Sequence, residues 1–213
     1  MRVVSVNVGL PREVEWRGKQ VTTGIFKTSV AGPVAVAGVQ LAGDGQADPS
    51  VHGGPGKAVY GYPSEHFEFW QRAYPEVEIG PGVFGENLTL EGWLEENVHL
   101  GDRFRAGTAE LVVTQPRVPC FKLGLRFGRP DVVKRFLAED RSGIYFAIAK
   151  PGEVAAGDPF ERIAEDSRRV SVADIVRIYR GELDDPDLLQ RAIAVESFPE
   201  EFRQIYREKL ARR

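Results

Sequence analysis

Two patterns of hydrophobic and polar positions follow one another along the chain. Up to about residue 160, short apolar or β-branched runs are bounded by Gly, Pro or Asp, which is typical of strands joined by tight turns. Strands are expected at residues 2–8, 34–39, 87–90, 110–113 and 144–149. Many short strands with few helices predict a mostly β domain with some α, built as a barrel or a sandwich.

Two helices are expected between these strands. Residues 64–74 begin with a serine that favours the N-cap, and they place Phe67, Trp70 and Tyr74 on one face at helical spacing. Residues 130–138 begin with a proline, which is common in the first turn of a helix, and continue with Val133, Phe136 and Leu137.

From residue 170 onward the pattern becomes helical throughout. Ser171 and Asp174 form a capping-box pattern, Pro186 stands at the start of a second helix, and Pro199 precedes two glutamates at the start of a third. We therefore expect one domain over residues 1–165 and a small three-helix C-terminal region over residues 170–213. That region has no Cys, His or Gly-rich loop, which favours docking or assembly, such as a homodimer, over chemistry.

Composition narrows the cellular compartment and the kinds of binding partner that are expected. A chain of 213 residues can bury a core without disulfides, and its single cysteine suits a reducing compartment. The formal net charge of −3 argues against bulk attraction to nucleic acid. No apolar run approaches the roughly 20 residues of a membrane helix, and the N-terminus does not have the pattern of a signal peptide. We expect a cytoplasmic protein that binds neither nucleic acid nor membranes.

The strongest candidate for chemistry is QPRVPCFK at residues 115–122. Two prolines stiffen the backbone just before Cys120. Arg117 and Lys122 place positive charge near its thiol, which favours the thiolate, a soft ligand for transition metals. The alternative is a buried, unreactive cysteine that serves packing alone.

Two glycine-rich segments are weaker candidates. In VHGGPGKA at residues 51–58, backbone N–H groups could converge on an anion and Lys57 adds charge, although Ala58 stands where a P-loop would have Ser or Thr. GDGQAD at residues 43–48 holds two carboxylates that could serve proton transfer. Either segment could instead be an ordinary turn, and His52 alone is more often structural than a ligand.

Several kinds of site are not expected, because their motifs are missing. The chain has three histidines and no HExxH or CxxC pattern, so a tetrahedral structural zinc site is not predicted. One cysteine cannot hold an iron–sulfur cluster. Flavin, nicotinamide and nucleophile-elbow fingerprints are also missing. His66 and His99 are expected to be surface or structural residues.

Eight short motifs in a fixed order point to a family. They are GIFKTS at 24–29, GDGQAD at 43–48, VHGGPGKA at 51–58, YP at 62–63, FGENL at 84–88, QPRVPC at 115–120, SGIY at 142–145 and GD at 157–158. Together they resemble the MOSC domain family, most closely its YiiM-like branch. The resemblance spans a core of about residues 20–163, and the helical tail is similar to the C-terminal region of YiiM-like proteins.

The resemblance implies a barrel-like β fold and a molybdenum cofactor, in which the metal is bound to the dithiolene of a molybdopterin with a phosphate tail. The metal-ligating cysteine of the family maps onto Cys120, which would also be catalytic. Lys27, Lys57 and Arg117 are candidates for binding the anionic tail, and Asn87 is a candidate for a polar contact to the pterin.

The resemblance also implies an activity, the molybdenum-dependent reduction of N-hydroxylated compounds, including N-hydroxylated purine bases such as 6-N-hydroxylaminopurine. His52 or a nearby carboxylate would supply protons, with His52 as the second catalytic candidate. Because the chain has no visible flavin, haem or iron–sulfur site, the electrons must come from a separate reductase. Two alternatives remain open: a sulfur transferase that carries a persulfide on Cys120, or a non-catalytic carrier of the cofactor.

Overall fold

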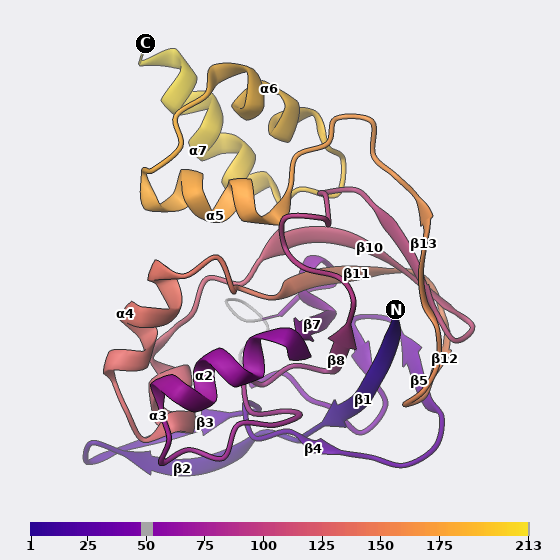
Figure 1. The fold of residues 1–213 in the computed structure, drawn as a ribbon, viewed down its shortest axis with the longest axis vertical. Helices are drawn as coiled ribbons and strands as arrows, with labels where there is room; N and C mark the ends of the chain where they lie inside the picture. The colour runs from indigo at the N-terminus through magenta and orange to yellow at the C-terminus, as the bar shows by residue number, and fades with distance from the viewer. Residues whose placement is uncertain (48–52, 213) are drawn as a thin grey trace.

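The computed structural model describes residues 1–47 and 53–212. An eight-stranded sheet lies at its centre, with the strand order β13-β9-β10-β11-β7-β8-β1-β4 (Figure 1). Neighbouring strands are antiparallel except for β7 and β8, which are parallel. The strands are β1 Arg2–Val8, β4 Thr28–Ser29, β7 Val59–Pro63, β8 Leu88–Glu91, β9 Arg103–Ala106, β10 Ala109–Pro116, β11 Ile144–Lys150 and β13 Phe160–Ala164.

The sheet is open, so the barrel-like closure expected from the sequence is not confirmed. Within the described residues, no ladder joins the two edge strands β13 and β4. The start of the chain meets the segment that enters β13 through an isolated bridge between Arg2 and Pro159 and through backbone hydrogen bonds, such as that from the Val3 N–H to the Asp158 carbonyl oxygen at 2.9 Å. These contacts do not continue as a ladder, and a proline has no N–H group with which to extend one. The prediction of a mostly β fold with some helices is confirmed.

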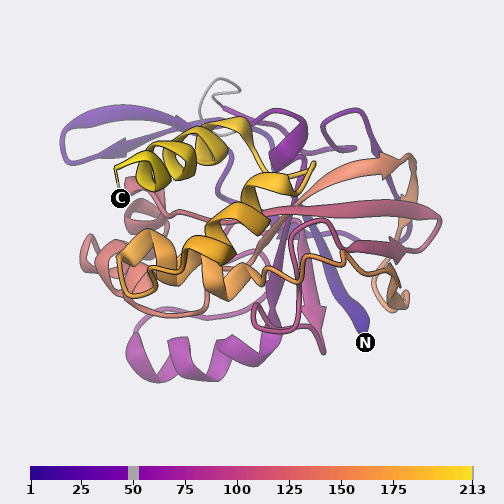
Figure 2. The same ribbon diagram turned by 90° about the horizontal axis from the view of Figure 1, so that it is seen from above.

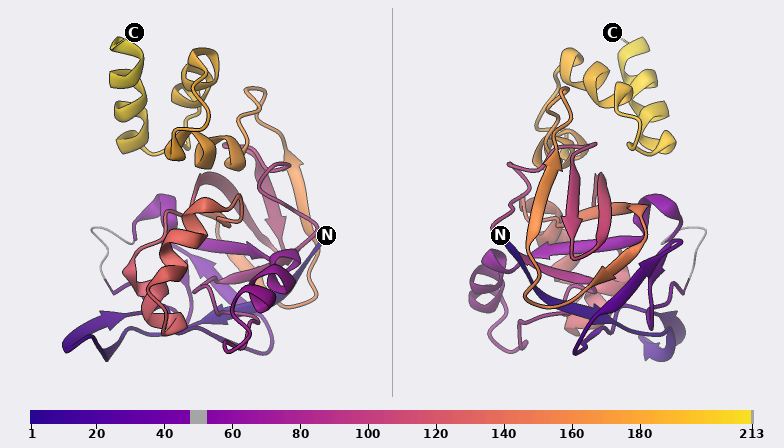
Figure 3. Two further views of the ribbon diagram at one scale, coloured as in Figure 1. Left: turned by 60° about the vertical axis from the view of Figure 1, so that its left-hand side comes forward. Right: turned by 90° about the vertical axis from the view of Figure 1, so that its right-hand side faces the viewer.

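Two smaller sheets accompany the central one. One contains β12 (Gly152–Val154), β5 (Val34–Ala37) and β6 (Gln40–Leu41). The other is a hairpin of β2 (Arg12–Trp16) and β3 (Lys19–Thr23), which pair only with each other. Figures 1 and 3 show this hairpin at the end of the molecule opposite to the C-terminus.

The helices between the strands include both predicted ones. A 3-10 turn, η2 (Ser64–His66), leads into α2 (Phe67–Ala73), and Pro130 precedes α4 (Asp131–Ala138). The turn η1 (Pro55–Lys57) and the helix α3 (Phe121–Phe127) were not expected. α3 begins directly after Cys120, so the candidate cysteine stands at its N-cap.

The three C-terminal helices are also confirmed, as α5 (Val172–Arg180), α6 (Pro186–Ala194) and α7 (Glu200–Ala211). In the capping box of α5, the Ser171 hydroxyl accepts from the Asp174 N–H at 3.0 Å, and the Asp174 carboxylate accepts from the Ser171 N–H at 3.0 Å. Figures 1 and 2 show the three helices together at one end of the molecule. No described helix is both long and apolar enough to cross a bilayer.

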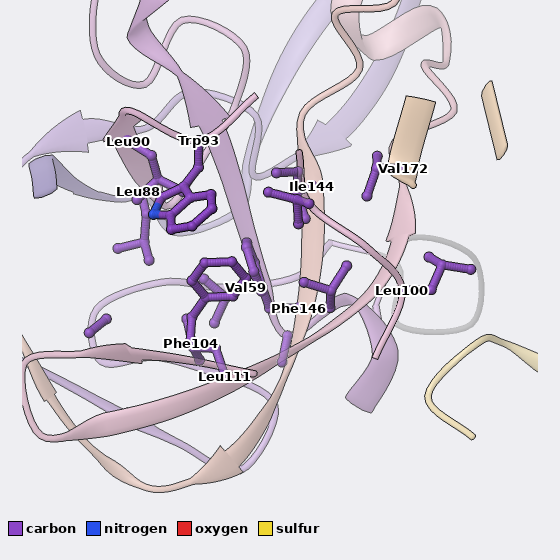
Figure 4. Packing of buried hydrophobic residues seen from close by; sticks show 14 of the residues in the cluster. Val59, Leu88, Leu90, Trp93, Leu100, Phe104, Leu111, Ile144, Phe146 and Val172 are labelled. Atoms are coloured by element: carbon purple, nitrogen blue, oxygen red, sulfur yellow. The ribbon is translucent and has the colours of Figure 1, made fainter. Parts of the chain in front are cut away.

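Two hydrophobic clusters hold these elements together. The larger one lies between the sheet and the C-terminal helices, and it includes Phe104 and Phe146 from the sheet and Val172 from α5 (Figure 4). The smaller one is aromatic and joins α2, α3 and α4 to β7 through residues such as Tyr62 and Trp70. Burying one such large side chain stabilises the fold by about 1.5–3 kcal/mol, so both clusters fix the segments that lead to the site.

Candidate functional site

One open pocket collects every predicted cofactor-binding residue that the structure describes. Lys27, Lys57, Asn87, Arg117 and Cys120 all line it, although they come from four separate segments of the chain. Its volume is about 730 Å³ when the open mouth is included. His52 lies outside the described residues, so its role as a proton donor stays a prediction.

The cysteine is set in the pocket wall by the end of β10 and the start of α3. β10 ends at Pro116, and Cys120 takes an extended conformation at the N-cap of α3. The thiol-bearing residue is partly exposed. Val118 is 37% exposed and Phe121 is 51% exposed, so apolar side chains accessible to solvent flank Cys120 on both sides.

Contacts with Phe84 and Tyr60 hold the Arg117 side chain in the wall of the pocket. Its guanidinium donates a hydrogen bond to the carbonyl oxygen of Phe84 and lies 4.9 Å from the centre of the Tyr60 ring. Burial opposes its charge, but the neighbouring Tyr60, Tyr145 and Cys120 outweigh burial and raise the pKa of Arg117. Arg117 and Cys120 are therefore electrostatically coupled, as the sequence pattern predicted.

A buried carboxylate organises the opposite wall. Asp44 forms an ion pair with Lys27, and both side chains are less than 10% exposed. The Asn87 side-chain amide donates to Asp44 at 2.8 Å, and the Gly9 N–H donates at 3.0 Å. Burial lowers the pKa of Lys27 despite the opposing effect of Asp44. The charge of Lys27 is thus largely neutralised within the protein.

Asn87 also has a structural task. Its side-chain oxygen accepts a hydrogen bond from the Tyr60 N–H at 3.0 Å, while its amide group serves Asp44. Asn87 therefore ties β7 to the loop at residues 43–47. Its contact with a pterin, like the binding of an anionic tail by Lys27, Lys57 and Arg117, stays a prediction.

Sequence reasoning assigned no role to Glu86, which lies fully buried beside the pocket-lining Gly85 and Asn87. Its carboxylate accepts from the Gly82 N–H at 2.6 Å, the Phe84 N–H at 3.0 Å and the Thr89 hydroxyl at 3.0 Å. Burial nonetheless raises the pKa of Glu86 to about 7. Only its place in the FGENL motif could have drawn attention to it.

Two tyrosines in the pocket also received no role from the sequence. Tyr60 and Tyr145 both line the pocket, and their ring centres are 4.9 Å apart. The Tyr60 hydroxyl donates to the carbonyl oxygen of Ser142 at 2.7 Å, and burial raises the pKa of both phenols. The sequence shows both tyrosines within apolar strands, and this pattern does not distinguish a pocket residue from an aromatic residue of the core.

The two described histidines lie outside the pocket-lining set and are largely buried. The His66 ring nitrogen Nε2 lies 2.8 Å from the carboxylate of Glu95, and His99 lies 3.4 Å from Asp102. Glu95 also accepts from the Gly143 N–H at 2.7 Å. These contacts confirm the structural alternative given for both histidines.

The charges of the pocket favour an anionic ligand. Among the described lining residues, Lys27, Lys57, Arg117 and Lys122 are cationic, and Asp44 is the carboxylate. In the described part of the chain, no group of three or more His, Cys, Asp or Glu side chains is arranged to hold a metal ion. A partly exposed cysteine in a pocket lined by cations therefore suits an anionic ligand that sulfur can bind.

Comparison with known proteins agrees with this description. The model of the MOSC domain matches residues 48–161, which is more than half of the chain. The chain belongs to the MOSC domain family. It is 39% identical to Protein YiiM of Escherichia coli over 146 residues, which cover 67% of this chain and 65% of that protein. The family resemblance predicted from the ordered motifs is thus confirmed.

The solved structures show the same likeness. The crystal structure of YiiM from Geobacillus stearothermophilus is similar to this MOSC protein with a TM-score of 0.80 and 34% identity, and the match covers 98% of each chain. A protein named reductase from Gibberella moniliformis is 34% identical over 166 residues. That match covers 76% of this chain but 29% of the larger fungal protein.

Proposed function

We propose that this MOSC protein is a molybdenum-cofactor-dependent reductase of N-hydroxylated compounds, such as N-hydroxylated purine bases. The observation that carries the proposal is the pocket itself, where Cys120 stands among four cationic side chains and one carboxylate that is already paired. The relative named reductase supports an oxidoreductase in general. Molybdenum bound by a pterin dithiolene would supply two-electron reduction of the N–O bond.

The residues of the chain would bind and orient this cofactor. The Cys120 thiolate would be the protein ligand of the metal, since soft sulfur donors suit it. Arg117 favours the thiolate through its charge. Lys57 and Lys122 are further cationic residues that line the pocket, and they would attract the anionic parts of the ligand.

The planar substrate would enter through the open mouth, past the exposed side chains of Val118 and Phe121. Reduction of an N–OH group consumes two electrons and two protons and releases water. The protons would come from His52 or from a pocket group open to solvent.

The test compares the wild type with Cys120→Ala, both purified from cells that make molybdenum cofactor. Elemental analysis measures molybdenum and fluorescence measures the pterin. We expect near-stoichiometric metal in the wild type and its loss in the variant, with reduction of an N-hydroxylated purine by the wild type when a reduced dye donates electrons. Cys120→Ser, which keeps the size and polarity of the side chain, is the matched control for folding.

Other outcomes separate the alternatives. Wild type without metal, from cells with a verified cofactor supply, would contradict the reductase and favour sulfur transfer through a persulfide on Cys120. Bound cofactor without turnover of any N-hydroxylated compound would indicate a carrier. Equal molybdenum in the wild type and in Cys120→Ala would remove Cys120 from the metal site.

A further inference from the structure

The β2–β3 hairpin has two chemically different faces. Side chains alternate along a strand, and the register pairs Trp16 with Lys19 and Arg12 with Thr23. One face therefore carries Arg12, Trp16 and Lys19. The opposite face carries Glu13 and Glu15, together with Gln20 and Thr22 from β3. All acidic residues of the hairpin thus lie on one face and its basic strand residues lie on the other.

The basic face of the hairpin meets α3 across a single aromatic ring. The guanidinium of Arg12 lies 4.0 Å from the centre of the Phe26 ring, and that of Arg126 on α3 lies 5.3 Å from the same centre. Burial lowers the pKa of Arg126, and the like charge of Arg12 lowers it further, against the opposing effect of the buried Glu86. The Nε atom of Arg126 is buried without a hydrogen-bond partner.

This surface continues into the mouth of the pocket. Arg126 follows Lys122 by one helical turn on α3, so the two lie on neighbouring positions of one face, and Lys122 lines the pocket. Phe26 stands between Ile25 and Lys27, which also line it. α3 contains no acidic residue, and its first residue, Phe121, is exposed. We call this area the hairpin–α3 surface: Arg12, Trp16, Lys19, Phe26, Phe121 and Arg126.

We propose that the hairpin–α3 surface docks the acidic face of an electron-carrying protein. The inference rests on the proposed function, which requires electrons at Cys120 from a separate donor. A redox partner must bring its own centre close to the pocket mouth, and this surface borders that mouth. The guanidinium groups of Arg12 and Arg126 lie over the same Phe26 ring, so an anionic partner would meet two like charges close together. The complementary partner is a protein whose redox group is surrounded by Asp and Glu side chains.

The charge distribution favours an acidic protein over other polyanions as the binding partner. The chain as a whole carries a formal charge of −3, so a basic patch at one end would orient an acidic carrier toward the pocket rather than attract polyanions generally. The aromatic ring of Phe26 between the two guanidinium groups suits the small, partly apolar contact of a transient electron-transfer complex.

Binding is measured first, because it does not depend on bound cofactor. The probes are purified flavodoxin and plant-type ferredoxin, both acidic carriers, with the basic cytochrome c as the control. Titration calorimetry at low and at high salt compares the wild type with Arg12→Gln/Lys19→Gln. The matched control, Gln20→Glu/Thr22→Glu, lies on the opposite face of the same hairpin and changes the net charge equally.

We expect an acidic carrier to bind the wild type at low salt and to dissociate at high salt. The dissociation constant should rise about tenfold in Arg12→Gln/Lys19→Gln and stay within about twofold in the matched control. Arg126→Gln should weaken binding as well. Thermal melting verifies that each variant folds.

The turnover assay separates this proposal from the proposed function. A reduced viologen dye needs no docking, so both hairpin variants should match the wild type with the dye and differ only when the protein carrier donates. No turnover of the wild type with the dye would contradict the reductase, while the calorimetry would still report on docking. The docking proposal is overturned if no acidic carrier binds, if the two double variants bind equally, or if the surface instead binds single-stranded oligonucleotides.

Discussion

At the scale of single residues, the pocket is built around two buried carboxylates with opposite character. Asp44 gathers donors that stabilise its charge, among them Lys27 and the amide of Asn87. Glu86 also accepts three hydrogen bonds, but its full burial dominates and keeps a proton bound up to near-neutral pH. Asp44 is therefore paired with a cation, while Glu86 is buried without one among the described residues and has a raised pKa.

Removing the charge of Asp44 should destabilise the fold strongly. Asp44→Asn leaves the Lys27 ammonium buried without its counter-ion, and breaking a buried pair costs about 3–5 kcal/mol. Urea unfolding at neutral pH measures the loss. In the double variant Lys27→Met/Asp44→Leu no charge is left unpaired, so it should recover most of the stability. A cost below about 1 kcal/mol for Asp44→Asn would show that the pair is solvated in solution.

Glu86 predicts a specific dependence of stability on pH. Its pKa is raised from 4.5 in the unfolded chain to about 7 in the folded one, so the folded state binds the extra proton between these values. Stability from this group is therefore fully present below pH 4.5 and is lost as the pH rises through about 7. Glu86→Gln, which mimics the neutral acid, removes this titration.

The measurement is the free energy of unfolding of both proteins at several pH values. Between about pH 5 and pH 8 the wild type should lose up to about 3 kcal/mol relative to Glu86→Gln. A constant difference between the two proteins over this range would mean that Glu86 titrates normally in the folded state.

At the scale of elements, the sequence predicted what local patterns determine. The capping box of α5 and the proline at the start of α6 are local signals, and both helices begin where expected. α3 was missed because its apolar residues Leu123 and Phe127 follow a proline-rich turn and pack against α4, a contact that sequence does not reveal. The prediction of barrel-like closure was not confirmed, for a related reason. Closure depends on how the edges of strands that are far apart in the sequence meet, and local patterns do not show this.

The candidate site shows the same division. The ordered motifs led to residues that share one pocket, because six of the eight motifs supply residues that line it. The partners within the pocket could not be predicted: Asp44 was considered for proton transfer or as an ordinary turn residue, and Glu86 received no role. The surroundings of both carboxylates depend on burial and on hydrogen bonds between distant segments. Asp44 and Asn87, for example, are some 40 residues apart in the sequence.

At the scale of the whole molecule, the helical end and the sheet share one core. Leu188, Leu189, Ala192 and Phe198 belong to the same buried cluster as the sheet residues Phe104 and Phe146. Ser197 reinforces the contact, because its hydroxyl donates to the carbonyl oxygen of Val113 on β10 at 2.7 Å. The candidate pocket and the C-terminal helices are thus linked through β10, which leads to Cys120.

This shared core predicts that the chain unfolds as one unit, although the sequence predicts separate regions at 1–165 and 170–213. Leu189 is fully buried on α6, so Leu189→Ala should cost about 2–5 kcal/mol. Calorimetry should show a single transition that moves to lower temperature, and near-ultraviolet circular dichroism of the aromatic cluster around Trp70 should melt with it. The exposed Ile205→Ala on α7 is the control and should leave the midpoint nearly unchanged. Two transitions, of which only one moves, would instead establish that the helices fold apart from the sheet.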